Sequence, residues 1–141
     1  MNVAFGTDEH TPLTDAVRAD LEARGHTVVA VDDGQWVEVG HAVGRAVADG
    51  RADTGVLFCW TGTGASIAAN KVPGVRAALC ADAATAAGAR TWNDANVLAL
   101  SLRTTSEAEL AEILDAWFAG APSADDDDRA NIEHVSEIEG A

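Results

Sequence analysis

A cysteine at the end of an apolar run is followed directly by a loop rich in glycine and threonine. Cys59 closes the run GVLFC, and the next residues, WTGTGAS, lead into a helix-like stretch. Glycines let backbone N–H groups turn toward one point, and a helix start adds partial positive charge there. A thiol beside such a loop can remove a proton while the amides hold the oxyanion that forms. This arrangement suits proton abstraction next to a carbonyl.

Two other interpretations of the loop depend on fingerprints that the sequence does not complete. A Walker phosphate loop needs a lysine directly after its second glycine, whereas Lys71 lies seven positions after Gly64. A dinucleotide loop needs a third glycine, which the stretch GTGASI lacks. A simpler alternative also stands, in which Cys59 is only a small buried hydrophobic residue.

The other residues that could bind a metal are scattered. The four histidines and two cysteines have no close metal-ligand spacing, so we expect no metal and no cofactor. Cys59 and Cys80 each end an apolar run and are expected to be reduced thiols. The acidic run Asp125–Asp128 lacks the spacing and the glycine of a calcium loop, so we expect a solvated turn there.

The chain is strongly acidic. Its 141 residues include 23 acidic and 9 basic residues, which gives a formal net charge of −14. Such a field repels nucleic acid, and it suits a protein that stays soluble at high salt, so we predict a halophilic source. The alternative is a GC-rich genome, which favours Ala, Arg, Asp and Gly. The sequence has no apolar stretch long enough for a membrane helix and no signal-like start. We therefore expect a cytoplasmic protein without a membrane partner.

Strands and helices are expected to alternate five times before an acidic tail. The apolar patterns predict strands at 2–6, 26–31, 55–60, 75–80 and 96–102, and helices at 12–24, 36–48, 65–71, 82–90 and 106–120. Continuous apolar strands are typical of a parallel sheet covered on both faces, so the fold class is α/β with a five-stranded parallel sheet. Residues 121–141 are expected to form a tail outside the 1–120 domain, with a short helix near 129–138.

Ligands bind such sheets at the carboxyl ends of the strands. The segments GTDEH after the first strand, CWTGTGAS after the third and TWNDAN before the fifth are expected to meet at these carboxyl ends.

Three segments resemble a known enzyme family. The stretch CWTGTGASIAANKVPGVRAALC, the later NDANVLAL and the first strand ending in GTD are similar to the RpiB/LacA/LacB sugar-phosphate isomerases over about residues 1–119. This resemblance implies a Rossmann-like αβα sandwich that forms homodimers or pairs of dimers and uses no metal or organic cofactor. It also implies interconversion of aldoses and ketoses through an enediolate.

The same resemblance assigns roles to individual residues. Cys59 would move the proton between C1 and C2 as the catalytic base, with Thr61 as the second catalytic residue. The backbone amides from Thr61 onward would hold the enediolate, and the residues that supply them after Thr61 are Gly62, Thr63, Gly64, Ala65 and Ser66. Asp8 would bind sugar hydroxyls. Asn93 would come from the neighbouring subunit, because the family's site lies at the dimer interface.

The sequence departs from the family at four positions or segments. Trp60 replaces a glycine beside the base, and Trp92 replaces the ring-opening histidine. Glu9 stands where the family has a phosphate-binding histidine, which leaves His10 as the candidate, and DDDDRANIEH replaces an arginine-rich segment, which leaves Arg129. We therefore predict that ribose 5-phosphate is a poor substrate. The alternative is a homologue that binds a small molecule without turning it over.

Overall fold

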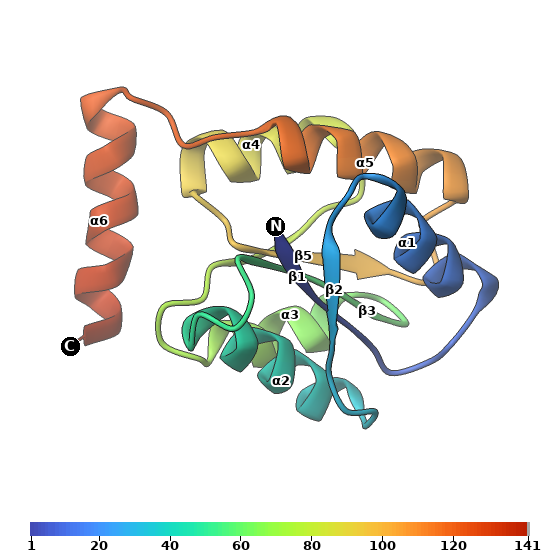
Figure 1. The fold of residues 1–141 in the computed structure, drawn as a ribbon. Coiled ribbons are helices and arrows are strands. Elements are labelled where there is room, and N and C mark those ends of the chain that lie inside the picture. Colours follow the sequence, from blue (N-terminus) through green and yellow to red (C-terminus); the bar gives the residue numbers. More distant parts are fainter. Residues whose placement is uncertain (141) are drawn as a thin grey trace.

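The computed structural model describes residues 1–140, and its five strands form one fully parallel sheet (Figure 1). The strand order is β2-β1-β3-β5-β4. The strands are β1 (Asn2–Thr7), β2 (Thr27–Ala30), β3 (Thr54–Cys59), β4 (Ala77–Leu79) and β5 (Val97–Ser101). Every residue of β3 and β5 is buried, as expected for central strands covered on both faces. The predicted α/β class and parallel sheet are confirmed.

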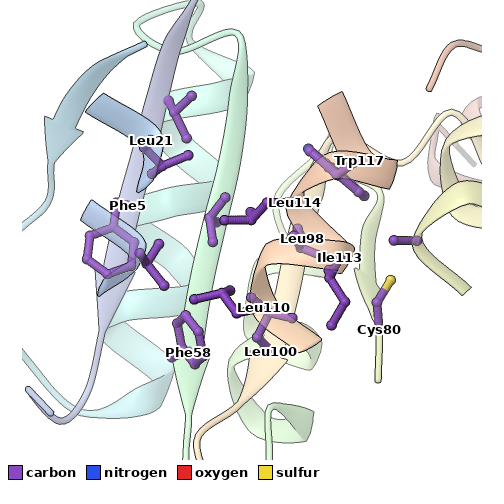
Figure 2. Close-up of a cluster of buried hydrophobic side chains, with 14 of the residues drawn as sticks. Phe5, Leu21, Phe58, Cys80, Leu98, Leu100, Leu110, Ile113, Leu114 and Trp117 are labelled. Carbon is purple, nitrogen blue, oxygen red and sulfur yellow. The ribbon is translucent and has the colours of Figure 1, made fainter. Parts of the chain in front are cut away.

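Helices cover both faces of the sheet (Figure 1). One face carries α1 (Pro12–Ala23), α4 (Ala83–Asn93) and α5 (Glu107–Ala119), and the other carries α2 (Trp36–Ala48) and α3 (Thr63–Asn70). Each face has its own apolar core. Figure 2 shows the first, which includes Phe5 and Phe58 of the sheet and Leu110, Ile113 and Leu114 of α5. The second core is built from smaller side chains, and Cys59 belongs to it.

Helices α2 and α3 pack unusually closely because small residues line their contact. A Cβ atom added to Gly40 would lie 2.5 Å from the carbonyl oxygen of Ala65 and 2.8 Å from the Cβ of Ala68. Real side chains do not tolerate such distances, so only glycine fits at this position. The first turn of α3 is therefore held firmly against α2.

Several elements differ in length from the prediction. Helix α3 begins at Thr63 rather than residue 65, and α4 continues to Asn93 instead of ending at residue 90. The tail forms α6 (Asp126–Gly140), which is longer than the short helix expected there. Its first turn holds three aspartates, which favour the positive end of a helix.

Helix α6 stands apart from the sandwich, at the left of Figure 1. None of its residues is buried. The Glu139 carboxylate accepts a hydrogen bond of 2.6 Å from the Gly74 amide, which lies just before β4. None of the helices within residues 1–140 is both long and apolar enough to cross a membrane.

The prediction that TWNDAN lies with the other two segments is wrong within one chain. Val97, the first residue of β5, pairs with Gly55 near the start of β3. The chain enters β5 at its amino end, so the residues before β5 lie at the amino ends of the parallel strands. Cys59, the last residue of β3, lies at their carboxyl ends.

Candidate active site

A cavity of about 280 Å³ lies at the carboxyl ends of β1 and β3. These two strands are neighbours in the sheet. The chain runs from β1 to β2 on one side of the pair, and from β3 to β4 and β5 on the other side. Connections that diverge in this way leave a crevice where parallel sheets bind their ligands. The cavity is lined by Asp8, Trp36, Cys59, Trp60, Thr61, Thr63 and Gly64.

The bend after Cys59 is fixed by the end of β5. The Cys59 carbonyl accepts a hydrogen bond of 3.0 Å from the Leu102 amide. The Trp60 carbonyl accepts two more, both of 3.0 Å, from the Arg103 amide and the Ser101 hydroxyl. Cys59 is only 4% exposed, yet it borders the cavity. The thiol is thus held in a defined place beside the loop.

The loop then turns sharply into α3 through a glycine. Gly62 has a φ of +78°, and a Cβ atom there would lie 2.5 Å from the Leu79 side chain and 2.9 Å from the Leu100 carbonyl carbon. This left-handed N-cap and the close approach both require glycine. The turn leads directly into α3, whose first residues Thr63 and Gly64 line the cavity.

Several of these amides have no hydrogen-bond partner. Within residues 1–140, the N–H groups of residues 61–65 make no such bond, whereas the Ser66 amide donates to the Gly62 carbonyl at 3.3 Å. Unpaired N–H groups at a helix start form a site for an oxyanion. The hydroxyls of Thr61 and Thr63 are hydrogen-bonded to each other at 2.7 Å. The free donors therefore lie within residues 61–65.

Asp8 lines the same cavity and carries an unsatisfied carboxylate oxygen. Its Oδ1 atom is buried and has no hydrogen-bond partner among residues 1–140. Burial raises the pKa of Asp8, and the nearby Glu9 charge adds to this rise against an opposing backbone hydrogen bond. A buried acceptor without a partner is costly, so it is well suited to accept a hydrogen bond from a ligand.

Five of the predicted site residues line this cavity, namely Asp8, Cys59, Thr61, Thr63 and Gly64. Gly62, Ala65 and Ser66 belong to the same loop and helix start without lining it.

The other three predicted residues lie elsewhere in the chain. His10 is hydrogen-bonded to Asp33 at 2.9 Å and lines a neighbouring cavity. Asn93 is exposed at the end of α4, and Arg129 is exposed on α6. A single chain therefore does not bring these three residues to Cys59.

Two residues near the site were not predicted to belong to it. Trp36 begins α2 and lines the cavity, but its distance from Cys59 along the chain hides this proximity. Arg103 follows β5, its amide binds the Trp60 carbonyl, and its exposed side chain makes no ion pair among residues 1–140. Its place directly after the expected strand was the available signal. Within residues 1–140, no group of three potential metal ligands lies close together.

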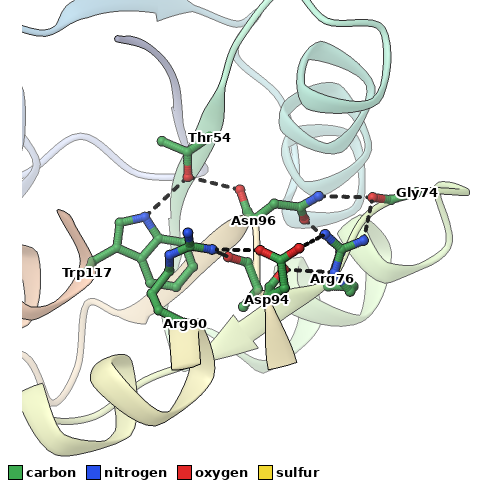
Figure 3. Close-up of polar contacts among 8 residues, drawn as sticks. Thr54, Gly74, Arg76, Arg90, Asp94, Asn96 and Trp117 are labelled. Atoms are coloured by element: carbon green, nitrogen blue, oxygen red, sulfur yellow. Dashed lines mark hydrogen bonds and ion pairs between the residues drawn. The ribbon is translucent and has the colours of Figure 1, made fainter. Parts of the chain in front are cut away.

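The segment NDAN has a structural role at the opposite edge (Figure 3). Asp94 adopts the left-handed conformation with a φ of 46°, and its carboxylate accepts hydrogen bonds of 3.2 Å from both Arg76 and Arg90. The Asn96 side chain accepts from the Arg76 amide at 2.7 Å and donates to the Gly74 carbonyl at 2.9 Å. These contacts join the starts of β4 and β5 and leave Asn93 exposed.

Comparison with known proteins decides the family. The sequence model of the family described as Ribose/Galactose Isomerase matches residues 3–135. The chain belongs to the ribose/galactose isomerase family. Ribose-5-phosphate isomerase B of Escherichia coli is 40% identical over 97% of this chain and 95% of its own length. Galactose-6-phosphate isomerase subunit LacB of Clostridium acetobutylicum is 34% identical over 98% of this chain and 83% of its own.

The fold agrees with this family along nearly its full length. The structure of Clostridium thermocellum ribose-5-phosphate isomerase B superposes with a TM-score of 0.92 at 34% identity, covering 99% of this chain and 98% of that one. The Rossmann-like αβα sandwich implied by the sequence resemblance is confirmed. In this member of the ribose/galactose isomerase family, the cavity is lined by Cys59, by Asp8 with its unpaired oxygen, and by residues of the loop that carries the free amides.

Proposed function

We propose that the protein is an aldose–ketose isomerase that acts on a small sugar or sugar phosphate. The single observation that best supports this is the cavity in which Cys59 faces the start of α3, in a chain that belongs to the ribose/galactose isomerase family. Family membership supplies the reaction class, and the cavity supplies the groups that this reaction needs.

In the proposed mechanism, the deprotonated Cys59 sulfur removes the proton from C2 of the open-chain aldose. The electron pair of that C–H bond forms the C1–C2 double bond, and the carbonyl oxygen gains negative charge. Unpaired amides within residues 61–65 stabilise this enediolate, because fixed donors need no reorganisation as charge develops. Transfer of the C2 hydroxyl proton to the C1 oxygen, together with return of the carbon proton from Cys59 to C1, gives the ketose.

Asp8 and Thr61 would complete the site around the reacting carbons. The unpaired Oδ1 atom of Asp8 would accept a hydrogen bond from a sugar hydroxyl, which would satisfy a buried acceptor. Thr61 lines the cavity beside the base, and its hydroxyl is oriented by Thr63 at 2.7 Å. Both would position the substrate rather than supply the first proton acceptor.

We propose that the active form is a homodimer, alone or paired into a tetramer, with Asn93 reaching the cavity of the other subunit. Asn93 and Cys59 lie at opposite edges of the sheet in one chain, so a shared role requires a second copy. Exposed apolar side chains could bury surface between copies, among them Trp92, Val135 and Ile138. In a dimer, Arg129 could also approach the partner's site.

The test is an isomerisation assay with ribose 5-phosphate, galactose 6-phosphate and the unphosphorylated pentoses and hexoses. We expect turnover of at least one of them, with a kcat/KM for ribose 5-phosphate below about 10⁴ M⁻¹s⁻¹, an ordinary value for an enzyme on its own substrate. This low value is expected because Glu9 and the segment DDDDRANIEH put acidic residues where the family binds phosphate through a histidine and arginines. Saturable binding without turnover of any substrate would instead favour a non-catalytic binding protein.

A further inference from the structure

Two of the seven residues that line the cavity at Cys59 are tryptophans. Trp36 from the start of α2 and Trp60 from the bend after β3 both line the cavity. They are 44% and 58% exposed, so each ring offers a free surface. Trp117, by contrast, is buried in the core beneath α5. Two exposed tryptophans beside a buried thiol therefore form a distinct feature of the site.

The Trp36 ring is seated on the helix that supplies the amides. A Cβ atom added to Gly64 would lie 2.8 Å from Cε3 and 2.9 Å from Cδ2 of Trp36. These atoms belong to the six-membered ring, so the indole packs directly on the backbone of the first turn of α3. Because Gly64 has no side chain, the ring can lie this close to the amides of that turn.

Trp60 is fixed through its backbone. Its carbonyl accepts hydrogen bonds from both the Arg103 amide and the Ser101 hydroxyl, and it follows the base directly in the chain. The other cavity side chains are a carboxylate, a thiol and two hydroxyls, with no lysine, arginine or histidine among them. A phosphate placed here would meet the Asp8 carboxylate without a side-chain cation, which is unfavourable.

We propose that Trp36 and Trp60 are specificity-determining residues that pack on an uncharged, C–H-rich segment of the sugar next to Cys59. This inference rests on the proposed function and names the part of the substrate that the cavity accepts. The hydroxyls of that segment bind Asp8 and the threonines, while its C–H groups lie against the indole rings. Any phosphate on the substrate lies outside the cavity.

The experiment measures binding without turnover. The Cys59→Ala protein is titrated by calorimetry with D-ribose and with ribose 5-phosphate, and the substitutions W36A, W60A, W36F and W60F are added to it one at a time. Ile67→Ala is the control for removing an exposed apolar side chain, because Ile67 is 59% exposed and lies outside this cavity. Sedimentation of each variant reports whether the assembly has changed.

We expect W36A and W60A each to weaken D-ribose binding by about 2- to 12-fold, the range that one aromatic contact supplies. The phenylalanine variants should keep most of the affinity, and I67A should stay within about twofold, below that range. Ribose 5-phosphate should lose affinity by a similar factor, since the segment that contacts the rings is the same.

Four results would overturn the inference. They are no saturable D-ribose binding, unchanged affinity in W36A and W60A, a loss no larger than that in I67A, or a loss that accompanies dissociation of the assembly. The two proposals can fail separately. Turnover by the wild type with unchanged affinity in W36A and W60A would contradict only the role of the tryptophans. Binding that depends on the tryptophans, without turnover by the wild type, would contradict only the isomerase function.

Discussion

The two ends of the sheet differ in whether their polar groups have hydrogen-bond partners. At the amino end, Asp94 bonds to Arg76 and Arg90, and both side-chain groups of Asn96 have partners (Figure 3). At the carboxyl end, the Asp8 Oδ1 atom and the amides of residues 61–65 have no partner among residues 1–140. Paired groups stabilise a fold, whereas unpaired groups at a cavity are available to a ligand. The difference separates the part of the chain that holds the sheet together from the part proposed to do chemistry.

The two cysteines show the same contrast on a smaller scale. Cys59 borders the cavity, while Cys80 is 1% exposed within the core shown in Figure 2. Burial, with a smaller contribution from Asp82, raises the pKa of Cys80 to about 11, so this thiol stays protonated near neutral pH. Only Cys59 is placed to exchange protons with a ligand.

The largest expected effect is on catalysis at the carboxyl end. Cys59→Ala should lower kcat by about 10²- to 10⁴-fold, the usual loss when a general base is removed. The melting temperature should change little, because alanine fits a site already packed with small side chains. Cys80→Ala is the control and should keep near-normal kcat while losing stability. Near-normal turnover in Cys59→Ala would remove this residue from the mechanism.

The next effect is on stability at the amino end. Asp94→Asn should lower the free energy of unfolding by about 1–3 kcal/mol, because it weakens the contacts to two partly buried arginines. Asp94→Ala should cost about 1 kcal/mol more, since alanine tolerates the left-handed conformation less well than asparagine. Urea unfolding measures both. Glu112→Gln on the exposed face of α5 is the control for removing one charge, and equal values for all three variants would contradict the account.

A change of opposite sign is expected from Asp8. Burial raises the folded-state pKa of Asp8, so its ionised form destabilises the folded protein above that pKa. Asp8→Asn should therefore raise the melting temperature at pH 7 while weakening sugar binding. This gain should shrink as the pH falls through the raised pKa and vanish below the unfolded value of about 3.9. Glu9→Gln is the charge-matched control, and a gain that stays constant with pH would point to another cause.

The smallest expected effect concerns the whole surface. A net charge of −14 creates repulsion that salt screens, so the melting temperature should rise by a few degrees between about 0.1 M and 2 M KCl. Scanning calorimetry with sodium chloride as a second salt measures this rise. A flat or falling melting temperature would count against a halophilic source.

Much of the sheet could be predicted because its strands are continuous apolar runs, as in VLFC and VLALS. The loop after Cys59 could be predicted too, because closely spaced glycines directly after an apolar strand are typical of a tight turn. The start of α3 was placed too late, since the left-handed turn at Gly62 depends on close contacts with Leu79 and Leu100 from other strands.

Other features depend on contacts between distant segments, which a local pattern does not contain. Trp36 reaches the cavity because α2 packs tightly on α3 through Gly40. The hydrogen bonds of Asp94 and Asn96 likewise depend on Arg76, about 20 residues earlier. The sequence motif NDAN therefore contains residues in two different situations. Asp94 and Asn96 make hydrogen bonds that join β4 and β5, whereas Asn93 is exposed, and only the structure distinguishes them.

The most direct test of the central claim is solvent exchange at the carbon next to the carbonyl. The wild-type protein and Cys59→Ala are incubated in D₂O with an aldose that the wild type isomerises. Deuterium at the reacting carbons of substrate and product is followed by proton NMR. We predict that the wild type incorporates deuterium while it isomerises the sugar, and that Cys59→Ala does so at least about 10²-fold more slowly. Incorporation by Cys59→Ala at the wild-type rate would contradict the account.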